Sequence, residues 1–241
     1  MKIVQLSDLH LTLPGAELFG SSPLARLELA VDRILADHAD ADFCLLTGDL
    51  ADAGSDIAYA ALAQALKRLP MPAHLLPGNH DSRDALRRNF PQLPANDGSF
   101  IQAALDTPGG RFLLLDTVEA GAPWGSYCAD RRAWLTRQMA AAGDLPLYIA
   151  MHHPPLALGI PSMDQFALRD SEAFWSVIAP HRARIRHLFF GHLHWPIGGS
   201  WHGIPFSCTS SPNHQIALDL ATLRGDEVPG CREPAGYAVI L

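Results

Sequence analysis

Short apolar runs alternate along this chain with longer stretches in which apolar residues recur three and four positions apart. The apolar runs, typical of buried β-strands, cover residues 3–6, 43–47, 74–77, 111–116, 147–151, 185–190, 204–208 and 237–241. The helical pattern covers about residues 23–38, 57–69, 130–142 and 171–180. Strands that alternate with helices in this way predict an α/β fold.

Two stretches between these elements predict irregular structure, at 90–98 and 155–169, because both carry Pro and Gly and neither has a clear period. No repeat, low-complexity segment or linker divides the chain, so we predict a single domain over residues 1–241. Within it, residues 207–236 are rich in Pro, Gly and Cys and are a candidate cap or dimerisation segment. A homodimer or higher homo-oligomer is therefore an expectation.

Composition restricts the class of partner. Hydrophobic residues make up 48% of the chain and charged residues 18%, which supports a sizeable core and excludes a disordered chain. The net charge of -7 and the total of 18 Lys and Arg argue against a nucleic-acid interface, which needs clustered cations. No apolar run reaches the roughly 18 residues of a membrane span. We therefore expect neither nucleic acid nor a membrane as partner.

The beginning of the chain and its cysteines bear on location. The first strand leads directly into Asp8, which belongs to a motif described below, so a secretory signal there would have to include a motif residue. Cys44 lies inside an apolar strand, and none of the four cysteines forms a CxxC pair, so a buried free thiol is expected at Cys44. We predict a cytoplasmic protein.

Five short polar motifs follow one another along the chain, and four of them come directly after an apolar run. They are Asp8-Leu9-His10, Gly48-Asp49, Gly78-Asn79-His80-Asp81, His152-His153-Pro154-Pro155 and Gly191-His192-Leu193-His194. Ligand sites of α/β sheets lie at the carboxyl ends of strands, where these motifs are predicted to be. Gly-Asp or Asp-x-His alone could be an ordinary turn, but the ordered set predicts one shared site.

The motifs supply carboxylate, imidazole and amide groups and contain no thiol. The candidate metal ligands are Asp8, His10, Asp49, Asn79, His152, His192 and His194. Mixed nitrogen and oxygen ligands suit Mn or Fe, with Zn or Co as alternatives, and disfavour a structural zinc site or an all-oxygen calcium site. Seven ligands are too many for one catalytic ion with an open position. They fit two divalent ions that share a carboxylate, with Asp49 as the natural bridge.

The spacing within the motifs is consistent with convergence. Asp8 and His10 are two residues apart, as are His192 and His194, so an extended backbone would point both members of each pair to the same side. A glycine precedes the ligands in three motifs and allows the chain to leave its strand sharply.

Two ions in one site would clamp the attacking and leaving oxygens of a phosphoryl group and lower the pKa of a bound water towards about 7. His80, beside Asn79, is a candidate catalytic residue that contacts the phosphate or protonates the leaving alkoxide. Asn79 counts as catalytic as well as a ligand. Asp81 either orients the imidazole of His80 or caps a helix that begins after Ser82.

With these residues in place, the chain resembles calcineurin-like metallophosphoesterases, and among them the bacterial branch of class III cyclic nucleotide phosphodiesterases and glycerophosphodiesterases. The motifs that carry the resemblance span residues 2–194, and Pro155-Leu156-Ala157-Leu158-Gly159 and Met163-Asp164 extend it. The family implies a four-layer αββα sandwich of two mixed β-sheets flanked by helices.

The resemblance also implies roles. Asp8, His10, Asp49 and His194 would hold one metal, and Asp49, Asn79, His152 and His192 the other. His152, two residues before the proline, takes the ligand position in place of His153, and His80 contacts the phosphate. In the family a hydroxide that bridges the two metals attacks phosphorus directly.

The expected function is thus a binuclear-metal phosphodiesterase for a small diester, either a 3′,5′-cyclic nucleotide such as cyclic AMP or a glycerophosphodiester. The alternatives are a non-catalytic metal-binding scaffold, or a phosphomonoesterase or nuclease, of the same fold. The loop at 156–170 and the tail at 207–236 are expected to shape the pocket. Candidate substrate contacts are His153, His214 and Tyr127.

Overall fold

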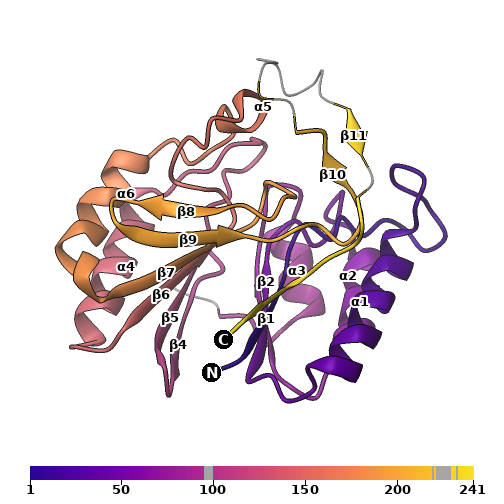
Figure 1. Cartoon of the computed structure of the whole chain (residues 1–241), viewed down its shortest axis with the longest axis horizontal. Helices are drawn as coiled ribbons and strands as arrows, with labels where there is room; N and C mark the ends of the chain where they lie inside the picture. The colour runs from indigo at the N-terminus through magenta and orange to yellow at the C-terminus, as the bar shows by residue number, and fades with distance from the viewer. Residues whose placement is uncertain (95–99, 219, 221–228, 232) are drawn as a thin grey trace.

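Two β-sheets pack face to face with helices on both outer faces in the computed structural model of the chain (Figure 1). The structure describes residues 1–94, 100–218, 220, 229–231 and 233–241. The αββα arrangement of two mixed sheets confirms the predicted fold class.

The first sheet has the strand order β12-β1-β2-β3, in which β1, β2 and β3 are parallel and β12 is antiparallel to β1. Its strands are β1 (Ile3–Leu6), β2 (Phe43–Thr47), β3 (Ala73–Leu76) and β12 (Ala238–Ile240). Three helices pack on its outer face: α1 (Pro23–Asp37), α2 (Asp56–Leu66) and α3 (Arg83–Asn89).

The second sheet has the order β4-β5-β6-β7-β9-β8, with antiparallel edge strands β4 and β8 around a parallel centre. Its strands are β4 (Ala103–Thr107), β5 (Gly110–Leu115), β6 (Leu147–Met151), β7 (Ile185–Phe190), β8 (Gly198–Trp201) and β9 (Ile204–Cys208). The outer face carries α4 (Ala129–Ala141) and α6 (Ser171–Ile178), and α6 leads into the 3-10 helix η1 (Ala179–Arg184).

Alternation along the strands builds the layers. In β1, Val4 and Leu6 belong to the cluster beneath the helices, whereas Ile3 faces the other sheet. Between the sheets, the ring of Phe112 stacks on Tyr148 at 4.5 Å between centroids and meets Phe43 edge-on at 5.1 Å. Each sheet is therefore apolar on both faces, which explains why its strands appear in the sequence as continuous apolar runs.

Every strand and helix predicted from periodicity is present, with small shifts at its ends. The structure adds α3, α5 (Pro161–Asp164), β4, β8, and the two-residue strands β10 (Gln215–Ile216) and β11 (Gly230–Cys231). Residues 155–169, predicted as a loop, thus contain the one-turn helix α5. It begins with Pro161, whose fixed φ suits the first turn of a helix.

Cys44 is buried, and the four cysteines are free thiols, as expected for Cys44. Within the described ranges, no helix has the length and apolar character needed to cross a membrane. The predicted cap or dimerisation segment at 207–236 lies partly outside the described residues; its described part includes β10 and β11, at the upper end of the molecule in Figure 1.

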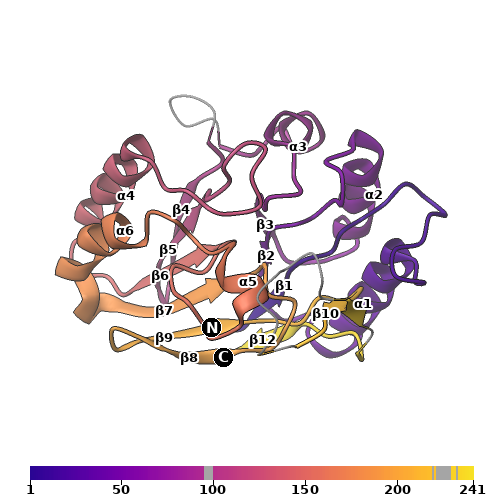
Figure 2. The same ribbon diagram turned by 90° about the horizontal axis from the view of Figure 1, so that it is seen from above.

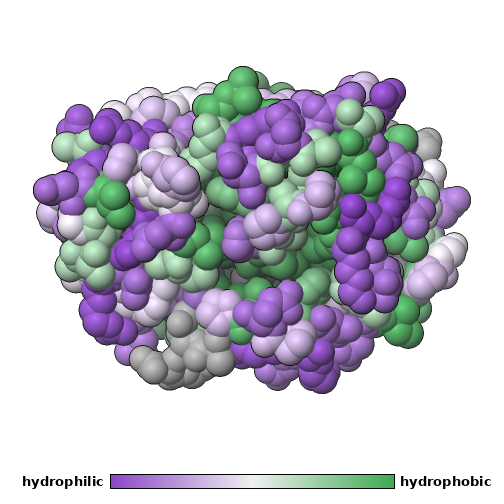
Figure 3. All heavy atoms as spheres, turned by 90° about the horizontal axis from the view of Figure 1, so that it is seen from below, coloured by the Kyte–Doolittle hydropathy of each residue, from purple (hydrophilic) through white to green (hydrophobic). Residues whose placement is uncertain are grey.

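Parallel strands from both sheets bring their carboxyl ends to one end of the sandwich. The carbonyl of Thr47, at the end of β2, contacts His152, which directly follows β6, and the N–H of Gly191 after β7 donates to His152. Seen from above, α5 and β10 lie over this end (Figure 2). At the opposite end, apolar side chains gather in a central hollow (Figure 3).

Candidate metal centre

The first set of predicted ligands converges at the end of the sandwich. Asp8, His10, Asp49 and His194 each offer one ligand atom, and these atoms lie within 4.8 Å of one another. All four side chains are buried. Two strands of the first sheet and one of the second lead into these residues, so the site forms only when the sheets pack.

The second set lies beside the first and shares Asp49. Nε2 of His152 is 3.3 Å from Oδ2 of Asp49 and 3.2 Å from Oδ1 of Asn79. The rings of His152 and His192 are 5.1 Å apart between centroids. Because Oδ2 of Asp49 is also 3.6 Å from Nε2 of His10, this carboxylate contacts both sets, as a bridging ligand would.

Left-handed backbone, and not extended backbone, directs these side chains. Five of the seven predicted ligands have positive φ: Asp8 (55°), His10 (46°), Asp49 (50°), His192 (73°) and His194 (59°). The expectation that an extended segment aligns each pair two residues apart is therefore wrong. Positive φ is uncommon for residues other than glycine, and such strain concentrates at functional sites.

Three histidines are held through Nδ1 by oxygen acceptors. Nδ1 of His152 lies 2.8 Å from the carbonyl of Thr47, and Nδ1 of His194 lies 2.9 Å from the carbonyl of His214. Nδ1 of His10 lies 3.1 Å from Oδ1 of Asp52. Carbonyl and carboxylate oxygens accept, so these contacts assign a proton to Nδ1; in the neutral ring the lone pair is then on Nε2, the usual arrangement around a metal.

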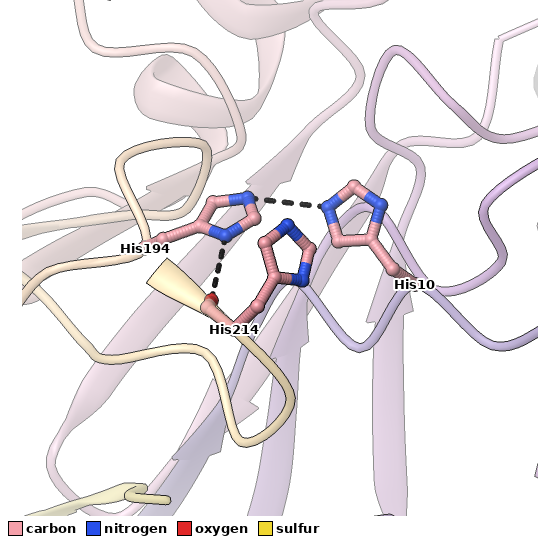
Figure 4. Close-up of side chains that lie close together, drawn as sticks. All are labelled: His10, His194 and His214. Atoms are coloured by element: carbon pink, nitrogen blue, oxygen red, sulfur yellow. Dashed lines mark hydrogen bonds between the residues drawn. The ribbon is translucent and has the colours of Figure 1, made fainter. Parts of the chain in front are cut away.

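Several polar atoms in the cluster have no suitable hydrogen-bond partner within the described part of the protein. Nε2 of His10 and Nε2 of His194 face each other at 3.2 Å, as Figure 4 shows, although the Nδ1 contacts favour a lone pair on each. Oδ2 of Asp8 and Nε2 of His192 are buried without a hydrogen-bond partner. Cations coordinated by these atoms would satisfy all four, so the residues fit divalent metal ions.

The pKa shifts divide the ligand histidines. Burial opposes the charge of His152, but Asp49 nonetheless raises the pKa of His152 to about 9, so this ring must release a proton when it binds a metal. Burial lowers the pKa of His194, and burial and the charge on His152 lower that of His192, so both are in the neutral form that binds metal. Burial opposes the charge of Asp49, but His152 and His10 nonetheless hold the pKa of that carboxyl well below its usual range.

Glycines before the ligands serve mainly by their small size. A Cβ atom at Gly78 would overlap the carboxylate of Asp49, and one at Gly191 would overlap the hydroxyl of Ser7. Only Gly48, with φ of 98°, needs the conformational freedom expected of all three.

His80 lies at the edge of the cluster and is part of the pocket wall. Its backbone N–H donates to Oδ1 of Asp49 at 2.9 Å, and Nδ1 lies 2.8 Å from the carbonyl of Asp52. The side chain is 40% exposed, so a ligand in the pocket can reach the ring. Its position suits the predicted role, whereas its orientation comes from Asp52.

Asp81 does not orient His80. Its carboxylate accepts hydrogen bonds from the N–H groups of Leu50, Ala51 and Gly78 and from the hydroxyl of Tyr59. Burial and the charge of Asp49 raise the pKa of Asp81 to about 6, against the effect of these donors. The alternative role, helix capping, belongs to Ser82, whose side chain accepts from the N–H of Ala85. Asp81 instead joins the loops after β2 and β3.

Of the three candidate substrate contacts, only His214 lines the pocket. Tyr127 is fully buried and its hydroxyl donates to Gln102, so it cannot reach a substrate. His153 is also fully buried, with Nδ1 2.8 Å from the hydroxyl of Thr117. The prediction for Tyr127 is wrong because its side chain packs in the core of the second layer. His153 lies instead behind the pocket wall, next to His152 and His192, and its buried Nε2 has no hydrogen-bond partner among the described residues.

The pocket over the cluster has a volume of about 360 Å³. Its floor is formed by metal-ligand candidates, and Met163 and Phe166 from the loop at 156–170 and His214, Ile216 and Gly230 from the tail line it too. Both segments were expected to shape the pocket.

The sequence argument missed two residues of this site. Asp52, three positions after Asp49, contacts His10 through its side chain and His80 through its carbonyl. Phe19, in the loop between β1 and α1, lines the pocket although no motif surrounds it. Asp52 could have been found from the sequence, because it is an acidic residue three positions after the predicted ligand Asp49. Nothing in the sequence around Phe19 marks it as a pocket residue.

Comparison with known proteins agrees with this geometry. A family model described as Calcineurin-like phosphoesterase matches residues 1–196. A probable cyclic nucleotide phosphodiesterase of Rhodopseudomonas palustris is 40% identical over 241 residues, covering 99% of this chain and 87% of that protein. The glycerophosphodiester phosphodiesterase GpdQ of Enterobacter lignolyticus is 31% identical, covering 97% of this chain and 81% of that protein.

Among solved structures, a dimetal phosphatase from Danio rerio shares the fold, with a TM-score of 0.70 at 14% identity and 88% coverage of each chain. The family model spans most of the chain, and the relatives align over nearly all of it. The chain is therefore a hydrolase that belongs to the calcineurin-like phosphoesterase family.

Proposed function

We propose that this protein hydrolyses a small phosphodiester, a 3′,5′-cyclic nucleotide or a glycerophosphodiester, at a centre of two divalent metal ions. The observation that carries the proposal is the convergence of two ligand sets on Asp49 beneath one pocket. The names of the relatives, a cyclic nucleotide phosphodiesterase and a glycerophosphodiester phosphodiesterase, support the two substrate classes.

Each set holds one ion in this proposal. The first consists of Asp8, His10, Asp49 and His194, and the second of Asp49, Asn79, His152 and His192. Mn or Fe is expected, and Zn or Co would also suit these ligands. When bound, the ions supply a nucleophile from water near neutral pH and stabilise charge on the phosphoryl oxygens.

His80 contacts the phosphoryl group or its leaving oxygen. The carbonyl of Asp52 holds the Nδ1 proton, so Nε2 is the atom left for the substrate. With protons on both nitrogens, the ring donates from Nε2 to the leaving alkoxide as the P–O bond breaks, and returns to the neutral form. After this transfer the neutral ring keeps its proton on Nδ1, and Nε2 can accept a hydrogen bond.

The pocket favours a small substrate over a polymer. Its volume of about 360 Å³ is at the lower end of the usual range for small-molecule sites. Among the residues that form its wall, all of them in the described part of the chain, there is no Lys or Arg to follow a nucleic-acid backbone. We further propose that the protein acts in the cytoplasm, that it forms a homodimer or higher homo-oligomer, and that it does not bind nucleic acid.

The decisive experiment measures hydrolysis of cyclic AMP, glycerophosphocholine and bis(p-nitrophenyl) phosphate by metal-free protein refilled with Mn. Asn79→Ala removes a proposed ligand, and Asn89→Ala, on α3 and outside the pocket, is the matched control. Bound Mn is counted by elemental analysis for all three proteins.

We expect turnover of one natural diester, and a loss of both activity and bound metal in Asn79→Ala only. Metal binding with no turnover on any of the three substrates would favour the non-catalytic scaffold. A fourth substrate, p-nitrophenyl phosphate, tests the phosphomonoesterase alternative, and turnover of this monoester alone would assign a different substrate class to the same site.

A further inference from the structure

We propose that Phe19 stacks on the nucleobase of the substrate, so that the diester taken by this site is a 3′,5′-cyclic nucleotide and not a glycerophosphodiester. The inference rests on the proposed function and goes one step further, because it assigns the part of the substrate that does not react. It also assigns a specificity-determining role to a residue outside the five motifs.

The pocket has two chemically different sides. The metal-ligand candidates and His80 form a polar side, where a phosphoryl group would bind. The lining also includes Leu18, Phe19, Met163, Phe166 and Ile216, which offer only apolar and aromatic surface, with the ring of His214 against Phe19. A ligand that fills both sides therefore carries a phosphate at one end and an apolar or aromatic group at the other.

Phe19 is held in an unfavourable backbone conformation. Residues 18–21 form a tight two-residue hairpin, in which the backbones of Leu18 and Ser21 exchange two hydrogen bonds. Phe19 has φ of 51° and Gly20 of 70°, the pair of positive φ angles that a type I′ turn requires. Asn or Asp is preferred at the first of these positions, and a large aromatic residue there costs backbone strain.

That strain presents the ring to the pocket. Phe19 is 49% exposed, so burial of its side chain does not explain its presence. Asn would suit the backbone of this position better, so the Phe side chain is there for what its ring contacts, in the wall and in the pocket.

Two distant segments hold the ring in place. The ring of His214 lies against Phe19, with 4.4 Å between centroids and 30° between planes. Ser21 donates to Oδ1 of Asn213 at 2.7 Å, which fastens the hairpin to the tail. Gly230 lies so close that a Cβ atom there would overlap the ring. Phe19 is thus part of a wall assembled from the hairpin and the tail.

The chemistry of this wall selects a planar aromatic group. Base–aromatic stacking needs only a π-face, which every nucleobase has. A glycerol moiety brings hydroxyl groups that need hydrogen-bond partners, and the apolar side of the pocket offers none from its five side chains. An aromatic ring could also attract the ammonium group of a choline or ethanolamine ester, so the test includes such esters.

The test compares Phe19→Ala and Phe19→Tyr with wild-type protein, all loaded with Mn. The substrates are cyclic AMP, which has a base, and glycerophosphoethanolamine and glycerophosphocholine, which have none. Leu13→Ala is the matched control, because Leu13 is exposed in the same loop but does not line the pocket.

We expect Phe19→Ala to raise KM for cyclic AMP by about 5-fold to 100-fold, as for loss of one stacked base, with kcat much less affected. This increase in KM should be at least about fivefold larger for cyclic AMP than for either glycerophosphodiester. Phe19→Tyr should return KM for cyclic AMP most of the way to the wild-type value, because the π-face is kept. Equal losses on all substrates, or a larger loss on glycerophosphocholine, would overturn the assignment.

Failure of the proposed function is separable from failure of this inference. If wild-type protein hydrolyses no diester, the proposed function fails; calorimetric titration with a phosphorothioate analogue of cyclic AMP then tests Phe19 alone. Weaker binding in Phe19→Ala than in Leu13→Ala would support the base contact, and equal binding would exclude it.

Discussion

At the residue scale, the proposed metal ligands depend on partners outside their own motifs. His10, His152 and His194 are each oriented through Nδ1, by Asp52 and by the carbonyls of Thr47 and His214 respectively. Such partners fix the ring orientation and the tautomer of a ligand histidine, and their loss commonly weakens metal binding. Asp52 is the only one of the three that acts through its side chain, so it can be tested by substitution.

Replacement of Asp52 by Asn or Ala should lower the affinity for Mn by about 10-fold to 100-fold. Both variants keep the backbone carbonyl that contacts His80 and change only the carboxylate, whose Oδ1 lies 3.1 Å from Nδ1 of His10 and 3.7 Å from Nδ1 of His80. Affinity is measured by calorimetric titration of metal-free protein. Asp40→Asn, at an exposed carboxylate, is the control; an affinity in the Asp52 variants within twofold of wild type would disprove the positioning role.

At the element scale, the site depends on how the loops after β2 and β3 are joined. Oδ1 and Oδ2 of Asp81 accept from N–H groups of both loops, and the hydroxyl of Tyr59 adds a donor from α2 at 2.8 Å. Asp49 and Asn79 lie on these two loops. Asp81 therefore sets the distance between two proposed ligands without touching a substrate.

Asp81→Asn should reduce the free energy of unfolding of the metal-free protein by about 3 kcal/mol, because an amide nitrogen would face backbone donors that are left unpaired. Tyr59→Phe removes one donor and should cost about 1 kcal/mol. Urea unfolding followed by tryptophan fluorescence measures both. Equal stability of Asp81→Asn and wild type would show that the loops are joined by other contacts.

At the scale of the whole molecule, the proposed centre takes ligands from both sheets and so requires their packing. Phe112 is fully buried between the sheets, stacked on Tyr148 and edge-on to Phe43. The same interface carries the prediction of a single domain, because two sheets that share one core should unfold together.

Phe112→Ala should cost about 3–5 kcal/mol, the usual price of emptying a large aromatic site, and should leave one cooperative transition. Leu145→Ala, at a side chain that is 43% exposed, is the control and should change stability by less than about 0.5 kcal/mol. Unfolding is followed by circular dichroism and by fluorescence. Two separated transitions would contradict the single-domain prediction.

The sequence by itself determined the elements and the chemical types of the site. Strands buried on both faces appear as apolar runs, and helices with one buried face show the 3.6-residue period, so both are local signals. A carboxylate such as Asp49 and an imidazole such as His152 can bind a metal in any fold, so the sequence reveals the type of ligand. Edge strands β4 and β8, which lack a continuous apolar run, were missed because cross-strand pairing defines them.

Only the tertiary structure decided which side chains meet. Neighbouring histidines such as His152 and His153 differ in role because one faces Asp49 and the other Thr117, and the sequence does not encode that direction locally. The sequence also misplaced two aromatic residues. Tyr127 was predicted to contact the substrate but is buried, whereas Phe19 was not predicted and lines the pocket. Contacts between residues far apart in the chain exist only after the sheets have packed, and the proposed metal centre and its pocket are made of such contacts.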